Sequence, residues 1–94
     1  LRSISTHKKR PKLVIGFSAE TENLLENSKK KFQIKQCDWM IANKITQKYG
    51  FESNKNKVIF IEKNNVEEWK VMTKKLVARK LVKKIVSFFK NYKL

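Results

Sequence analysis

Two short apolar runs separated by a charged amphipathic segment constrain the fold of this chain more than any other feature. The runs are Leu13–Phe17 and Trp39–Ala42, and each suits a strand that is covered on both faces. Between them, residues 20–35 carry glutamates early and lysines late, which complements a helix dipole. The sequence therefore predicts a βαβ unit over residues 13–43. The turn that opens at Gly16 lies where open α/β sheets bind ligands.

Candidate anion-binding residues lie on the predicted helix. Lys31 and Lys35 are one turn apart, and at about 100° per residue they lie at the border of the buried stripe, whereas Lys29 and Lys30 fall further round and are expected to be solvated. Two such ammonium groups beside a sheet can bind a polyphosphate, and Phe17 at the carboxyl end of the first strand can pack on a nucleoside. By pattern alone, the simpler interpretations are ordinary surface charge for the lysines and core packing for Phe17. The inward stripe of this helix is expected to be Leu24, Leu25, Ser28 and Phe32.

The rest of the chain predicts further strands and a final helix. Thr73 is the expected N-cap of that helix. The element order β-α-β-β-β-α resembles half of a larger α/β domain, because so small a sheet leaves a strand edge that upstream sequence, a partner chain or a dimer mate must cover. The predicted segments are a basic arm (1–12), a loop (44–57), strands (58–72, with a turn at 62–65) and the helix (73–90). The apolar face of the helix is expected to be Val77, Leu81, Ile85, Phe88 and Phe89.

Composition bounds the class of protein. The 94 residues make one domain at most, and the net charge of +15 favours either a surface for polyanions or a coding bias towards lysine. The single cysteine, Cys37, is expected to be a small buried hydrophobe in a reducing compartment. His7 stands alone in the basic arm, so neither a metal site nor a catalytic triad is expected. Because no apolar run approaches the roughly 18 residues of a membrane span, a cytoplasmic protein is expected.

Several segments together resemble the phosphopantothenoylcysteine synthetase domain of coenzyme A biosynthesis, the C-terminal part of the DNA/pantothenate metabolism flavoprotein family. The resemblance covers nearly the whole chain. The segments that carry it are Gly16-Phe-Ser-Ala-Glu-Thr-Glu-Asn23, the pair Lys31 and Lys35, Ile41-Ala-Asn43, Gly50-Phe51-x-Ser53, Asn56-Lys57-Val58, Val66-Glu-Glu-Trp69 and Met72-Thr73-Lys74.

This resemblance implies a fold and an activity. The fold would be a Rossmann-like three-layer α/β/α arrangement, of which this chain is the C-terminal half, and the enzyme would be a dimer. The activity would be a CTP-dependent ligase that joins 4′-phosphopantothenate to cysteine through an acyl-cytidylate, with Mg²⁺. By the same resemblance Phe17, Lys31 and Lys35 contact CTP. FMN belongs only to a fused decarboxylase domain that is not in this chain.

Departures from the family pattern leave alternatives open. Lys44 and Lys55 stand where the family usually has acids, and the upstream half of the ligase site is not in this chain, so no catalytic residue is assigned. The chain begins at Leu1, which suits a processed piece, an excised domain or a gene fragment. The partner would then be a complementary N-terminal ligase segment or a second copy. One alternative is an inactive remnant of the ligase. Another is a basic module that binds nucleic acid or a membrane surface through Lys70–Lys93, although the ligase interpretation needs neither partner.

Overall fold

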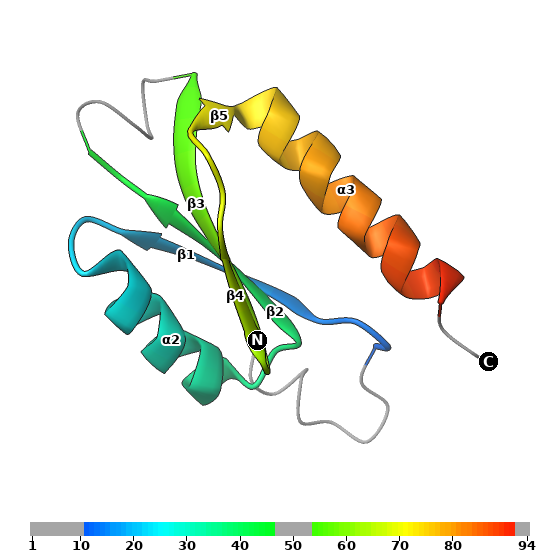
Figure 1. Cartoon of the computed structure of the whole chain (residues 1–94). Coiled ribbons are helices and arrows are strands. Elements are labelled where there is room, and N and C mark those ends of the chain that lie inside the picture. The colour runs from blue at the N-terminus through cyan, green and yellow to red at the C-terminus, as the bar shows by residue number, and fades with distance from the viewer. Residues whose placement is uncertain (1–10, 47–53, 92–94) are drawn as a thin grey trace.

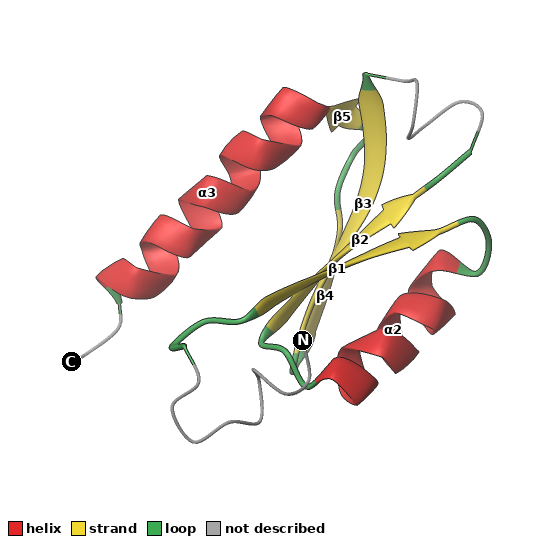
Figure 2. Ribbon diagram, turned by 180° about the vertical axis from the view of Figure 1, so that it is seen from behind, coloured by secondary structure: helices red, strands yellow, loops and turns green. Residues whose placement is uncertain are grey.

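The chain forms a mixed five-stranded sheet with one helix on each face, as the computed structural model of residues 11–46 and 54–91 shows (Figures 1 and 2). The strand order is β1-β2-β3-β4, and β5 pairs with another part of β3. Among the described strands, only β1 and β2 pair in parallel, which confirms the βαβ unit. The elements are β1 Ile15–Glu20, α2 Leu24–Lys35, β2 Trp39–Lys44, β3 Lys55–Glu62, β4 Asn65–Glu68, β5 Met72–Thr73 and α3 Lys74–Lys90.

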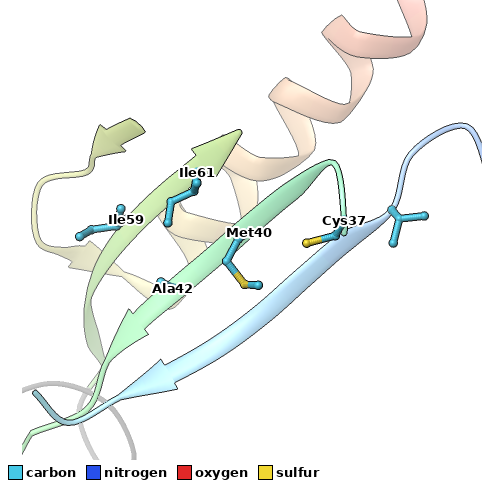
Figure 3. Packing of buried hydrophobic residues seen from close by; sticks show 6 residues of the cluster. Cys37, Met40, Ala42, Ile59 and Ile61 are labelled. Carbon is cyan, nitrogen blue, oxygen red and sulfur yellow. The ribbon is translucent and has the colours of Figure 1, made fainter. Parts of the chain in front are cut away.

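The face under α2 carries a core of small and medium side chains (Figure 3). Leu24 and Phe32 of α2 pack on this core, and Ser28 is fully buried between them. The hydroxyl of Ser28 donates to the Leu24 carbonyl, so its burial leaves no unsatisfied group. The predicted inward stripe is therefore confirmed at these three positions and wrong at Leu25, which is 41% exposed. The buried residues are Val14, Cys37, Met40, Ala42, Ile59 and Ile61.

The face under α3 carries an aromatic core. The rings of Phe60 and Trp69 stack with 5.9 Å between their centroids, and Trp39 meets Phe60 edge-on at 5.2 Å. Such pairs stabilise a core beyond the area that they bury. Four of the five predicted apolar residues of α3 pack on this face: Val77, Leu81, Ile85 and Phe88. The fifth, Phe89, is 47% exposed and does not belong to this core, so that assignment was wrong.

Thr73 caps α3 as the sequence predicts. Its side-chain oxygen accepts a hydrogen bond from the Leu76 amide at 3.2 Å, and its backbone is extended. The cap satisfies one of the amides that the first turn of a helix leaves without an intrahelical partner. Because Thr73 also belongs to β5, the cap fixes where the chain leaves the sheet for α3.

The strand that precedes α2 is longer than predicted. We expected it to end at Phe17 and the helix to begin near Glu20, but β1 continues through Glu20 and α2 starts at Leu24. The extension is held by strand pairing, because residues 18–20 of β1 pair in parallel with residues 42–44 of β2. Asn23, in the left-handed region at φ 47°, then turns the chain into the helix.

The second half of the sheet also differs in its boundaries. The predicted loop 44–57 is shorter, since β2 includes Lys44 and β3 begins at Lys55. The expected strand 66–72 is divided into β4 and β5, which adds one strand to the predicted order. The division follows Trp69, whose amide donates to the Val58 carbonyl at 3.0 Å before the chain leaves β3. The basic arm up to residue 10, and residues 47–53 of the loop, lie outside the described residues.

Candidate functional site

An ion pair occupies the carboxyl end of β1. Glu20, the last residue of this strand, is only 6% exposed, and the Lys31 ammonium of α2 lies 2.5 Å from its Oε2 atom. We expected Glu20 to be an early helix residue that interacts with the dipole, and this expectation was wrong. The strand instead places the Glu20 carboxylate against the middle of α2. Lys31 is partly exposed, so a positive charge remains available to solvent at the edge where α/β sheets bind ligands.

Lys35 lies one turn further along the same side of α2. Its side chain is half-buried, as is that of Lys31, whereas Lys29 and Lys30 are exposed, and this difference confirms the predicted border position. Lys35 lies near the start of β2, where its charge acts on Cys37. Burial raises the pKa of the Cys37 thiol, while the Gly16 backbone and Lys35 oppose the rise. Cys37 is thus the buried hydrophobe that the sequence predicts, at 7% exposure.

Phe17 lies on the opposite face of the sheet from these lysines. Its register partner Ile41 belongs to the core under α3, whereas Glu20, three residues later, faces α2. Core packing does not describe Phe17, because the side chain is 62% exposed. It lines a cavity of about 510 Å³ that contains neither Lys31 nor Lys35. The structure therefore places the three predicted contacts around the end of β1 and does not bring them into one pocket.

The sequence pattern does not predict the cavity beside Phe17. It lies between the carboxyl ends of β1 and β2, the start of β3 and the first turns of α3. Asn43 and Asn56 line it, and the Oδ1 atom of each is buried without a hydrogen-bond partner among the described residues. The available signal was an asparagine directly flanking each of two apolar strands. The facing of those side chains could be known only from the strand register.

The described residues do not fit a magnesium site built by this chain. Mg²⁺ prefers several oxygen ligands, usually carboxylates together with phosphates of the substrate. Within 11–46 and 54–91, no group of three or more acidic, histidine or cysteine side chains could hold a metal ion. The buried carboxylate of Glu20 is already paired with Lys31.

Comparison with known proteins identifies the family. Residues 1–89 match the model of the DNA/pantothenate metabolism flavoprotein C-terminal domain. The chain belongs to this family. It corresponds to the phosphopantothenoylcysteine synthetase part of the bifunctional proteins of coenzyme A biosynthesis, which confirms the resemblance seen in the sequence.

The relatives show how much of the domain this chain covers. It is 38% identical over 84 residues to the coenzyme A biosynthesis bifunctional protein CoaBC of Borreliella burgdorferi, spanning 88% of this chain and 21% of the relative. A crystal structure of the C-terminal domain of a CoaBC protein matches with a TM-score of 0.70 and 30% identity, over 98% of this chain and 43% of that one. The DNA/pantothenate metabolism flavoprotein of Streptococcus pneumoniae matches with a TM-score of 0.63 and 29% identity, over 80% and 34% of the two chains. This chain thus spans less than half of each of them.

Proposed function

We propose that this chain is the C-terminal half of a Rossmann-like, CTP-dependent ligase domain that joins 4′-phosphopantothenate to cysteine. The observation that carries the proposal is the family match over residues 1–89, which the likeness to a CoaBC C-terminal domain supports. In the first half-reaction, a carboxylate oxygen of the acid would bond to the α-phosphorus of CTP while pyrophosphate leaves with the electrons of the broken P–O bond. The cysteine amine would then displace CMP from the acyl-cytidylate.

The nucleotide would bind around the carboxyl end of β1. Phe17 would pack on the nucleoside, and Lys31 with Lys35 would attract the triphosphate as point charges. Phe17 and Glu20 are three residues apart, about 10 Å along a strand, so a nucleotide that passes over the end of β1 could contact Phe17 and Lys31 on opposite faces. Because Lys31 already contacts Glu20, the phosphate would share this ammonium with the carboxylate.

The upstream part of the domain would complete the site. Among the described strands β1 is an edge strand, since its only partner is β2. An unpaired edge is a template for a further strand, which either an upstream ligase segment or a second copy could supply. The proposed partners are thus CTP, 4′-phosphopantothenate, cysteine and this complementary segment, in the cytoplasm, with Mg²⁺ carried by the phosphates. In the part of the chain that the structure describes, no helix is long and apolar enough to cross a membrane.

A chimera tests this function. The last part of the Borreliella burgdorferi relative is replaced by this chain, and CTP-dependent pyrophosphate release is measured with 4′-phosphopantothenate and cysteine. We expect turnover in the chimera, and we expect it to fall at least about tenfold with Lys31→Ala, since hydrogen bonds to charged groups contribute about 1.5–3 kcal/mol. Lys30→Ala is the matched control, because Lys30 is exposed on the same helix.

A folded chimera without turnover would contradict the proposal and favour the inactive remnant. Folding is established separately, by a cooperative unfolding transition of the chimera. If turnover returned when Lys44→Asp and Lys55→Asp were introduced, the two acid-to-lysine departures would account for the loss. If it did not, the defect would lie elsewhere in the chain.

The outer face of α3 favours a second candidate function. Val82, Val86 and Phe89 are all about half-exposed, at a spacing of four and three residues, so they form one apolar stripe on the solvent side. Helix α3 contains no acidic residue among its 17 residues, and Lys83 and Lys90 are exposed beside the stripe. An amphipathic basic helix of this kind suits an anionic membrane surface. Flotation of the chain with phosphatidylserine vesicles, lost in Val86→Glu, would support this module, and no flotation at physiological salt would exclude it.

A further inference from the structure

A second hollow lies on the solvent side of α3. Its volume of about 540 Å³ falls within the range of small-molecule sites, roughly 300–1,000 Å³. One wall is the connection from β4 to β5 together with Met72, and the other is a face of α3 (Figure 1). None of the residues that line this hollow lines the cavity beside Phe17, so the two are separate.

Four basic side chains line the hollow. Lys70 comes from the connection between the strands, and Arg79, Lys80 and Lys83 come from α3. Lys83 lies three and four residues after the other two, so all three project from neighbouring positions of the helix. No acidic side chain is found among the described residues that line the hollow. Like charges at such close range repel one another, and an anion bound between them relieves this repulsion.

The nearest acids along the chain do not neutralise these charges. Glu67 of β4 pairs with Lys84 at 2.9 Å, and Glu68 pairs with Lys57 at 2.8 Å. No ion pair between described residues involves any of the four basic side chains of the hollow. Their positive charge is therefore available to a ligand.

Arg79 distinguishes the hollow from the lysine-rich surface in general. The chain has 23 lysines and arginines, but Arg79 is the only arginine within 11–46 and 54–91, so a coding bias towards lysine does not account for it. A guanidinium binds phosphate through two parallel hydrogen bonds, whereas lysines add point charges. The Lys80 ammonium lies 4.9 Å from the centroid of the Trp69 ring, a contact that positions the charge without neutralising it. These groups favour phosphate as the anion.

The floor of the hollow is apolar. Val71 and Leu76 line it and are 40% and 47% exposed, although both are aliphatic. Covering such surface with a ligand removes it from water, which is favourable. The hollow therefore suits a ligand that carries an organic group beside its phosphates.

We propose that this hollow binds a small diphosphate or triphosphate ester. The phosphates lie between Arg79, Lys80 and Lys83, and the organic group packs on Val71 and Leu76. The site does not depend on the proposed ligase function, because it shares no residue with the proposed contacts of CTP.

Amide NMR of the ¹⁵N-labelled chain tests the phosphate site, with inorganic tripolyphosphate as the probe at about 0.15 M salt, where diffuse attraction is screened. We expect saturable shifts of the amides of residues 70–72 and 79–83. Arg79→Ala should weaken this binding at least about tenfold. Arg79→Lys, which keeps the charge but loses the paired hydrogen bonds, should weaken it about threefold.

Lys75→Ala is the matched control, because it removes the same charge from an exposed position of α3 outside the hollow. It should leave the affinity within about twofold. Equal losses in Arg79→Ala and Lys75→Ala would show diffuse attraction to a basic surface and overturn the site. Shifts confined to the end of β1 and to α2 would overturn it as well, since they would report only the proposed CTP contacts.

The organic part of the ligand has its own test. Isopentenyl diphosphate and methyl diphosphate carry the same charged group but differ in apolar area. We expect the isopentenyl ester to bind at least about threefold more tightly, and Leu76→Ser to remove this difference while leaving the methyl ester unchanged. Equal affinities of the parent chain for the two esters would contradict the apolar contact.

Two large polyanions are the alternative occupants. The chain and its Arg79→Ala variant are titrated with duplex DNA and with phosphatidylserine vesicles at the same salt concentration. Binding of either one that is lost in Arg79→Ala, together with no saturable shifts from tripolyphosphate, would overturn the assignment to a small molecule. Saturable shifts from tripolyphosphate around the hollow, with neither polyanion bound, would support it.

Discussion

At the scale of single residues, the end of β1 depends on one ion pair whose members lie eleven positions apart. Glu20 is buried, and among the described residues its carboxylate pairs with Lys31, so loss of the ammonium leaves a carboxylate in a desolvated position. Lys30, one position earlier in α2, is exposed. The position therefore combines a structural role with the proposed attraction of phosphate.

We expect Lys31→Met to lower the free energy of unfolding by about 1 kcal/mol, because solvent screening of the partly exposed ammonium keeps the effect below that of a fully buried pair. Urea unfolding of the chain measures the change. Lys30→Met is the control and should stay within about 0.5 kcal/mol of the parent. Equal effects of the two substitutions would show that the Glu20 contact does not stabilise the fold.

The cap of α3 is a second contribution from a single side chain. Thr73→Ala removes the acceptor of the Leu76 amide, and we expect it to lower the free energy of unfolding by about 1 kcal/mol. Thr21→Ala is the control, since Thr21 is exposed between β1 and α2. A midpoint of urea unfolding that moves equally in both variants would contradict the capping role.

At the scale of elements, the described contacts of α3 with the sheet include an apolar stripe and the ion pair of Lys84 with Glu67. Ile85 packs on the aromatic core, whereas its neighbour Val86 is 59% exposed. Lys84 of α3 extends its side chain to the sheet. Its ammonium lies 2.9 Å from Glu67 Oε2 of β4 and 4.3 Å from the centroid of the Phe60 ring. The two kinds of contact can be separated by experiment.

Truncation of an apolar side chain of α3 should destabilise the chain only on the side of the helix that packs on the sheet. We expect Ile85→Ala to destabilise the chain by about 2 kcal/mol, through the lost burial and the cavity that remains. Val86→Ala should change the free energy of unfolding by less than about 0.5 kcal/mol, since an exposed position loses little packing. The reverse order would mean that α3 docks through its other face.

The ion pair predicts a pH dependence of stability. Burial alone would raise the pKa of Glu67, but the hydrogen bonds from Lys84 and Trp69 outweigh it and lower the pKa below its ordinary value of 4.5. A carboxyl group whose folded pKa is depressed stabilises the fold above its unfolded pKa, and this contribution is lost as the pH falls through the folded pKa. The stability difference between the parent and Lys84→Met should therefore be constant above about pH 5 and shrink below pH 4.5.

The matched control for this dependence is Lys83→Met, on an exposed position of α3. Unfolding midpoints measured from pH 3 to pH 7 should show no such pH-dependent difference for it. Part of the Lys84→Met difference should persist at pH 3, because the contact with the Phe60 ring does not titrate with Glu67. A Lys84→Met difference that is the same at every pH would contradict the ion pair.

At the scale of the whole molecule, the sequence predicted the elements better than their relations. The cap at Thr73 and the buried Cys37 follow from local chemistry, and the parallel pairing of β1 with β2 follows from the helix between them. The position of Phe17 and Lys31 on opposite faces of the sheet does not follow from local chemistry. It depends on which face of β1 lies against α2, and on β1 extending as far as Glu20, and both are set by packing.

The cavity beside Phe17 has a similar explanation. The side chains that line it come from β1, β2, β3 and α3, so their convergence depends on how these elements pack. The unsatisfied oxygens of Asn43 and Asn56 became visible only through the register of β2 and β3 and the docking of α3. Family resemblance supplied the candidate residues, and the structure supplied their separation.

The affinity of the chimera for CTP tests the central claim most directly, because that claim is that positive charge from α2 binds a triphosphate at the end of β1. Calorimetric titration should show saturable CTP binding that weakens at least about tenfold with Lys31→Ala and stays within about twofold of the parent with Lys30→Ala. Equal affinities in the parent and both variants would contradict the claim.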